Sequence, residues 1–370
     1  MAKVTAKTRM KDPFVEDDLL HTGSMMLNLA ISGNPKGGFL KGKYIYFVGD
    51  SSSGKTFFTL TALAEASINP IFDQYRLIYD DVEGGALMDV ETYFGPNLAD
   101  RIEPPAGTKD NPINSHYVED FYFNLDDAFK RQTPFIYVLD SQDSLDSMYS
   151  ERKFKQLKTS VRNPTSDEKA KGDYGDGKAK FHSTRLRSVI SRLRDSGSIL
   201  IVINQTRDVL DSKPFGPKSQ ASGGRALKFY ASVQLWTSVK GKKYKTINKK
   251  KRQIGITAQV AIKKNRIGGR EWSVDIPIYF SHGIDNIGSC VEFLCEEGRW
   301  NKSKSGSIIA SDFDGVSGNL DKVIRLIEEQ DLENEVFEIA QEVFEDLMEA
   351  SKVQRKNRYS RIDTGEGEGE

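Results

Sequence analysis

One glycine-rich segment fits the phosphate-binding P-loop pattern at every fixed position: Gly49, Asp50, Ser51, Ser52, Ser53, Gly54, Lys55 and Thr56. An apolar run ending at Val48 precedes it and another apolar segment, residues 57–66, follows it, so it should join a buried strand to a helix. Small residues let backbone N–H groups wrap phosphates, while the lysine reaches the outer phosphates and the threonine hydroxyl ligates Mg²⁺. The sequence therefore predicts a nucleoside triphosphate site. The alternative is a glycine-rich turn that matches by accident.

The chain of 370 residues is long enough for one large domain with a small appendage. Its 38% hydrophobic and 29% charged residues are ordinary for a soluble globular protein. No apolar run is long enough to cross a bilayer, and the basic N-terminal segment lacks the apolar stretch of a secretory signal. We therefore expect a cytoplasmic protein with no membrane partner. Two cysteines, Cys290 and Cys295, are too few for a disulfide framework.

Apolar runs typical of buried strands recur along the chain, separated by segments long enough for crossover helices. They are Tyr44–Val48, Arg76–Asp81, Phe135–Asp140 and Ile199–Asn204. This alternation predicts an α/β fold with a mostly parallel central sheet flanked by helices. Residues 231–236 and 256–262 are β-rich and are joined by a lysine-rich stretch, which predicts antiparallel edge strands in a hairpin with a mobile tip.

The composition changes along the chain in a way that predicts four regions. These are a short arm over residues 1–20, a core over 21–305, an acidic helical region over 306–362 and a disordered Gly/Glu tail over 363–370. Within the core, the segments near 150–182 and 206–224 mix charge, glycine and proline without periodicity. Irregular segments of this length in a compact domain are usually functional or disordered.

The charges are segregated although the formal net charge is zero. Eight of the thirteen residues from 240 to 252 are basic, whereas residues 321–350 carry eleven acids. This asymmetry predicts a body that binds a polyanion and an acidic end that competes for the same basic surface. Solvated faces of a hairpin and a helix are the alternative interpretation.

Two acids follow predicted strands. Asp140 ends the run Phe135–Asp140 and is the Walker B candidate, which would support the metal ion. Glu83 follows the strand that ends at Asp81, and hydrolysis needs such a carboxylate to orient the attacking water. A surface turn acid is the alternative for Glu83.

Several further segments, in collinear order over about residues 20–305, resemble the RecA family of recombinases. The strand at 199–205 ends in Asn204-Gln205, and the block Gly223-Gly224-Arg225-Ala226-Leu227-Lys228-Phe229-Tyr230-Ala231-Ser232-Val233 is similar to the family signature. Weaker matches occur at residues 22–30, 260–266 and 282–285. The resemblance implies a RecA-like P-loop ATPase with ATP and Mg²⁺ as cofactors, in which the P-loop and Asp140 bind nucleotide and Thr56 and Asp140 hold the metal.

The resemblance also implies roles for residues outside the P-loop. Glu83 would activate water, Gln205 would sense the terminal phosphate, and Lys264 and Arg266 would act on a neighbouring subunit's ATP as an arginine finger does. Lys228 and Phe229 would lie at the subunit contact. The candidate DNA contacts lie in the two irregular segments: Arg162, Lys169, Lys171 and Lys178 in the first, and Arg207, Lys213 and Lys218 in the second.

The activity implied is ATP-dependent coating of single-stranded DNA as a helical filament, followed by pairing with duplex DNA and strand exchange in recombination and repair. Single-strand binding and mediator proteins are the partners implied. The N-terminal arm is shorter than the segment that bacterial RecA docks on its neighbour, a pattern more typical of a divergent, phage-encoded, UvsX-like recombinase acting in a bacterial host cytoplasm. Two alternatives stay open: a ring-forming replicative helicase or loader ATPase, and a DNA-coating filament with little turnover.

Overall fold

The computed structural model describes residues 15–85, 89–162, 177–208, 219–221, 224–353 and 355. The chain divides into two compact units, the first ending at Glu292 and the second beginning at Phe293. The sequence predicts an acidic helical region from residue 306, and that boundary stays a prediction. No helix in the described part of the chain is both long and apolar enough to span a membrane.

A ten-stranded mixed sheet forms the centre of the first unit. Its strands, in spatial order, are β14 (Gly283–Ile284), β13 (Ser273–Tyr279), β12 (Lys250–Asn265), β11 (Val233–Ile247), β3 (Tyr44–Gly49), β9 (Ile199–Asp208), β8 (Phe135–Asp140), β4 (Arg76–Asp81) and β5 (Ile102–Glu103), with β10 (Ser219–Ala221) beside β9. The run from β11 to β5 is parallel, and β10, β12, β13 and β14 add antiparallel pairs. The predicted fold class, mostly parallel with antiparallel edge strands, is therefore confirmed.

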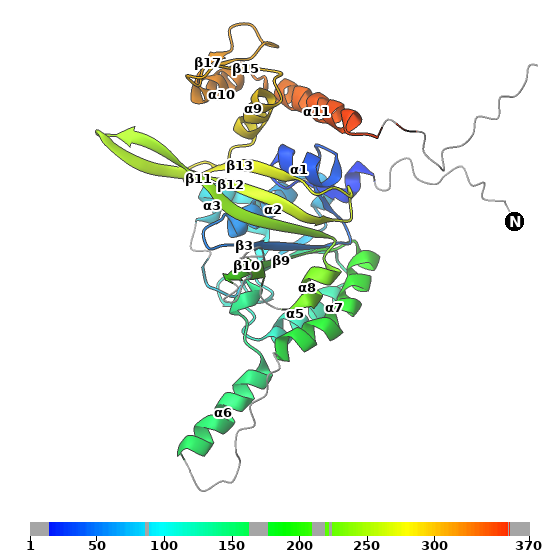
Figure 1. The fold of residues 1–370 in the computed structure, drawn as a ribbon. Coiled ribbons are helices and arrows are strands. Elements are labelled where there is room, and N and C mark those ends of the chain that lie inside the picture. The colour runs from blue at the N-terminus through cyan, green and yellow to red at the C-terminus, as the bar shows by residue number, and fades with distance from the viewer. Residues whose placement is uncertain are drawn as a thin grey trace, which may run out of the picture. The chain divides into compact units, whose positions relative to one another are not determined.

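Helices cover both faces of this sheet (Figure 1). On one face lie α5 (Val118–Lys130), α7 (Gly177–Ser196) and α8 (Arg225–Tyr230), which pack on β3, β8 and β9. The other face carries α1 (Met25–Ser32), α2 (Lys55–Ile68), α3 (Val90–Phe94) and α4 (Pro96–Arg101). Because both faces are covered, β3 is buried along its whole length, with Tyr46 facing α5 and α7 and Phe47 stacking on Phe58 of α2. This double burial explains the continuous apolar runs in the sequence.

Two parts of the sheet region differ from the sequence expectation. The lysine-rich stretch is strand and not a loop, because β11 and β12 pair through it as far as the turn at Asn248 and Lys249. Residues expected to be irregular form α6 (Met148–Arg162) and the start of α7. In α6 most of the described side chains are exposed, including the apolar Phe154 and Leu157, and Lys155 pairs with Glu151 one turn away. Charged and polar residues outnumber the apolar ones in this helix, which obscures its periodicity in the sequence.

Short elements complete the first unit. They are η2 (Glu16–Asp18), η3 (Pro70–Phe72), η4 (Gln142–Ser144), and the paired strands β1 (Leu19–Leu20) with β2 (Phe39–Leu40) and β6 (Ala106–Gly107) with β7 (Pro112–Ile113). Helix α9 (Asn286–Glu296) spans the division between the units. The second unit holds β15 (Asn301–Lys302), β16 (Ile308–Ile309), β17 (Ser317–Gly318), α10 (Leu320–Glu329) and α11 (Glu333–Ala350). Its Trp300 is buried and donates its indole N–H to Asp312 at 2.7 Å.

Buried His182 of α7 gives the fold a pH dependence that can be measured. Burial lowers its pKa to about 4, with the charge of Lys178 acting in the same direction, whereas an unfolded histidine titrates near about 6.5. The unfolded chain therefore binds more protons between these values, and stability falls as the pH falls through them. We expect His182 to remove about 2 kcal/mol of unfolding free energy between pH 7 and pH 5. Urea unfolding of the wild type and of His182→Gln at both pH values isolates this difference, and equal pH dependence would contradict it.

Candidate nucleotide-binding site

The P-loop connects the end of β3 to α2, and its geometry requires glycine at two positions. Gly54 has a φ of 91° and directly precedes the first residue of α2. A Cβ on Gly49 would lie 2.1 Å from Thr237 Oγ1 of the neighbouring strand β11. The hydroxyls of Ser53 and Thr237 lie 2.7 Å apart behind the loop. The loop is thus held closely against the sheet, and the N-terminus of α2 directs its N–H groups toward the space in front of it.

Lys55 is the only cationic side chain of the loop, and it is buried. Its Nζ donates to the carbonyl oxygens of Gly49 at 2.9 Å and Asp50 at 2.7 Å. Burial lowers its pKa, and the carboxylates of Asp140, Glu83 and Asp50 oppose that shift. A buried ammonium whose nearest partners are neutral carbonyls is suited to an anionic ligand such as a phosphate chain.

Asp140 and Thr56 provide adjacent oxygen ligands at the same edge. Thr56 Oγ1 donates to Asp140 Oδ2 at 2.6 Å, and Tyr79 Oη donates to the same oxygen at 2.8 Å. Burial raises the pKa of Asp140, and these two hydrogen bonds act in the opposite direction. A buried carboxylate beside a hydroxyl is a ligand set that fits Mg²⁺ and would regain from the ion the charge stabilisation that burial removes.

Glu83 lies two residues beyond β4 and is held by three donors. Its Oε1 accepts from the hydroxyls of Ser141 and Ser144, the latter at 3.0 Å, and from Gln205 Nε2 at 3.1 Å. Strand pairing explains this convergence, because Gly49 is in register with Gln205 and Asp81 with Asp140. The predicted P-loop, Walker B acid, water-orienting acid and sensor glutamine therefore meet at one edge of the sheet. Their roles stay predictions.

Lys264 and Arg266 lie elsewhere. Lys264 pairs with Gln234, which pairs with Tyr46, three residues before Gly49, so it lies about 10 Å back along the strands from the P-loop. Arg266 lies further from the P-loop. Its backbone N–H donates to the carbonyl oxygen of Ser232, and the N–H of Ser232 donates to the carbonyl oxygen of Tyr44, the first residue of β3. The structure does not bring these two cations to the nucleotide site of their own chain.

The comparisons with known proteins agree with this geometry. A family model described as the RecA N-terminal domain matches residues 159–285. The RecA protein of Thermus thermophilus is 27% identical over 299 residues, covering 79% of this chain and 76% of that protein. Those of Nostoc sp. and Prochlorococcus marinus are 26% and 28% identical, each covering 91% of this chain and, respectively, 83% and 78% of their own length. Over about four fifths or more of its length the chain is therefore similar to RecA-family proteins.

The segment that resembles the RecA signature forms α8 and leads into β11. Phe229 is 64% exposed, and burial lowers the pKa of the partly buried Lys228. The Nζ of Lys264 donates to the carbonyl oxygens of Lys228 at 3.1 Å and Phe229 at 2.7 Å, at the C-terminal end of α8. The predicted interface residues and one of the predicted trans-acting cations are therefore joined to one another on a surface away from the P-loop.

The predicted DNA contacts are only partly described. Lys178 lies in the first turn of α7, where its Nζ donates to the carbonyl of Leu145. Arg162 and Arg207 belong to α6 and β9, but their side chains lie outside the described residues. Lys169, Lys171, Lys213 and Lys218 also lie outside the described residues.

Sequence reasoning missed several side chains of the site. Ser141 and Ser144 hold Glu83, Tyr79 holds Asp140, and Thr206 Oγ1 donates to Asp50 Oδ1 of the P-loop. Thr206 directly follows Gln205, so this last bond ties the start of the second irregular segment to the phosphate-binding loop. Serines next to a strand-ending aspartate are too common to single out without the register of the sheet.

Proposed function

We propose that this chain is a RecA-family, ATP-dependent DNA recombinase, which coats single-stranded DNA as a filament and promotes pairing and strand exchange with a homologous duplex. The observation that carries the proposal is the contact between Gln205 and Glu83. It joins the strand leading into a predicted DNA-binding segment to the carboxylate that would orient water. Nucleotide state and DNA contact can therefore influence each other through one hydrogen bond.

Each residue of the site would have a distinct role in phosphoryl transfer. Lys55 and the backbone of the P-loop would hold the outer phosphates, while Thr56 and Asp140 would hold Mg²⁺. When bound, the ion neutralises charge on the phosphate oxygens. Glu83 would fix the attacking water, since its carboxylate is oriented by hydroxyl and amide donors.

The positions of Lys264 and Arg266 support a role in trans. A cation that acts on phosphate must reach it, and these side chains lie at the opposite end of the strands from their own P-loop. Phe229, exposed beside Lys264, is suited to a neighbouring subunit. Hydrolysis would then depend on assembly.

Glu83→Gln should separate binding from turnover. Because the amide cannot orient or accept a proton from water as the carboxylate does, ATP hydrolysis with single-stranded DNA should fall on the order of 10²- to 10⁴-fold. ATP-dependent DNA binding should persist, since the phosphate ligands are intact. Steady-state hydrolysis and DNA binding are measured for this variant and for Glu91→Gln on exposed helix α3. Turnover that survives in Glu83→Gln would show that another group orients water.

Negative-stain microscopy with single-stranded DNA tests the assembly. We expect helical filaments with a non-hydrolysable ATP analogue and none without nucleotide. Phe229→Ala should shorten them because it removes an exposed apolar contact, whereas Phe280→Ala, at another exposed phenylalanine, should leave them unchanged. Closed rings would favour a helicase or loader, and filaments without turnover in the wild type would favour a scaffold.

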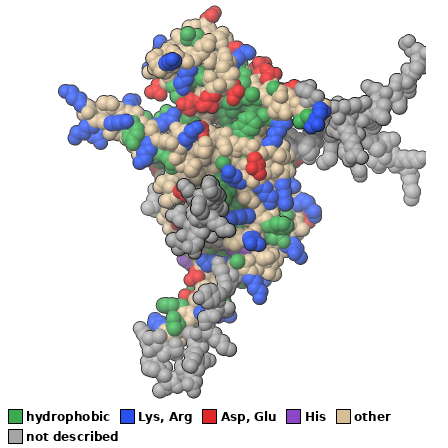
Figure 2. Space-filling view, in the orientation of Figure 1, with side chains coloured by type: hydrophobic (Ala, Val, Ile, Leu, Met, Phe, Trp, Pro, Cys, Tyr) green, Lys and Arg blue, Asp and Glu red, His purple; other side chains and the backbone are tan. Residues whose placement is uncertain are grey.

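The hairpin of β11 and β12 supports a contact with duplex DNA. Residues 240–252, here called the basic arm, extend past the neighbouring strands β3 and β13 (Figure 1). They carry basic side chains, which gather on the projecting arm (Figure 2). Lys240 and Lys243 pair with Asp275 and Glu292, but within the described residues no acid pairs with Lys242, Lys245, Lys249, Lys250, Lys251 or Arg252. Lys245 even lies directly opposite Arg252. Like charges placed across a strand pair disfavour that pairing, and an anionic ligand bound to the arm would offset the repulsion.

Neutralising Lys242, Lys245 and Arg252 to Gln together should weaken duplex capture. Each cation that no longer meets a phosphate reduces the slope of log affinity against log salt by about 0.9, so the slope should shrink by about 2 to 3. Lys302→Gln with Lys304→Gln, two exposed lysines of the second unit, is the control. Fluorescence anisotropy with labelled duplex over a salt series provides the measurement. An unchanged slope would rule out the arm as a phosphate-binding surface.

A further inference from the structure

Three polar side chains form a buried chain of hydrogen bonds behind the nucleotide site. Tyr122 of α5, His182 of α7 and Gln142 of η4 are all buried in the core. Tyr122 Oη lies 2.8 Å from His182 Nδ1, and Gln142 Nε2 lies 3.3 Å from His182 Nε2. The surrounding cluster is apolar, with Leu145 and Leu186 among its members. A buried network of this kind restricts each of its side chains to a single conformation.

Stability alone does not explain this network. Gln142 Oε1 has no hydrogen-bond partner among the described residues. An unsatisfied buried polar atom destabilises a fold, so an apolar residue of the same volume would serve the core better. Gln142 is the first residue of η4, so its hydrogen bond to His182 can fix the position of this short helix.

Helix η4 is the element that holds Glu83. It follows Asp140 and Ser141 directly, and the hydroxyls of Ser141 and Ser144, at its two ends, both donate to Glu83 Oε1. Gln142 anchors the same short helix from behind, through His182. Lys178 of α7 also donates to the carbonyl of Leu145, the residue after η4. The first turns of α7 thus fix the element that orients the carboxylate.

We propose that Gln142 and His182 are positioning residues for Glu83, through which α7 sets the orientation of the water-activating carboxylate. With the Gln142 amide as donor to His182 Nε2, the neutral ring carries its proton on Nδ1 and donates it to Tyr122 Oη, which accepts because a hydroxyl can take either role. Burial, which lowers the pKa of His182 to about 4, keeps the ring neutral at physiological pH. The inference rests on the proposed ATP hydrolysis.

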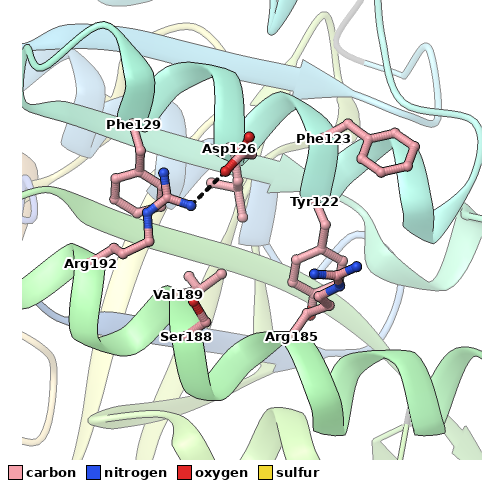
Figure 3. Close-up of a pocket in the computed structure, with 9 residues that line it drawn as sticks. Tyr122, Phe123, Asp126, Phe129, Arg185, Ser188, Val189 and Arg192 are labelled. Carbon is pink, nitrogen blue, oxygen red and sulfur yellow. Dashed lines mark hydrogen bonds and ion pairs between the residues drawn. The ribbon is translucent and has the colours of Figure 1, made fainter.

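A second contact between α5 and α7 offers a matched control. A pocket of about 250 Å³ lies between the two helices, with Tyr122 lining one part and Arg192 another (Figure 3). Arg192 pairs with Asp126 at 2.7 Å, and its guanidinium lies 4.2 Å from the centre of the Phe129 ring. This contact holds α7 on α5 but includes no residue of η4.

The test compares kcat and KM for ATP hydrolysis with single-stranded DNA in Gln142→Met, His182→Leu and Arg192→Met. Methionine at 142 fills the space without the amide, so folding should survive. Because a displacement near 1 Å at a reacting group lowers rates strongly, we expect kcat to fall about 10- to 100-fold in the first two variants, with KM nearly unchanged. His182→Gln, which keeps a neutral polar group, should retain more of kcat than His182→Leu.

Two results would overturn the inference alone: unchanged kcat in both Gln142→Met and His182→Leu, or an equal fall in Arg192→Met, which would point to general loosening of α7. A wild type without turnover would overturn the proposed hydrolysis and this inference with it. Thermal unfolding and binding of a non-hydrolysable ATP analogue, measured on every variant, separate a misplaced carboxylate from a protein that no longer folds or binds nucleotide.

Discussion

The parallel pairing of β3, β9, β8 and β4 is the constraint on which the site depends. In a parallel sheet the carboxyl ends of all strands meet at one edge, and ligands bind outside that edge. The register places Gly49 beside Gln205 and Asp81 beside Asp140. Residues spread over more than 150 positions of sequence, such as Thr206 and Asp50, are brought within hydrogen-bonding distance by this pairing. A slip of one residue in any strand would turn its side chains to the opposite face.

Burial at that edge then determines the electrostatics. Lys55 and Asp140 are both buried, and burial disfavours the charged form of each, lowering the pKa of the lysine and raising that of the aspartate. Neutral donors and acceptors from Thr56, Tyr79 and the P-loop carbonyls satisfy them only in part. A phosphate chain with a divalent cation supplies both missing charges at once, so the site is better matched to that pair than to either alone.

Much of this arrangement can be predicted from sequence, because its signals are local. Strands that are buried on both faces have continuous apolar sequences. The spacing of the glycines, lysine and threonine in the P-loop is fixed by the turn that the loop makes around the phosphates. The contacts of Gln142 with His182 are not local: they join residues 40 positions apart on different elements, and neither residue carries a motif. The strand character of the basic arm was missed because its stability comes from cross-strand hydrogen bonds and not from apolar alternation. Helix α6 was missed for a related reason: most of its described side chains are exposed, and its few apolar residues stand among many charged and polar ones.

The placement of Lys264 and Arg266 has a consequence for the whole molecule. They lie at the amino-terminal end of β3, and the nucleotide site lies at its carboxyl end, so one sheet presents cations at one edge and binds phosphate at the other. On the proposed function two such edges would be complementary between copies, and a contact that joins unlike surfaces repeats along an axis or closes into a ring. The electrostatic gain of that contact exists only while phosphate is present, because without it the buried Lys55 would face further cations. Nucleotide would then control assembly through charge, with no change of fold required.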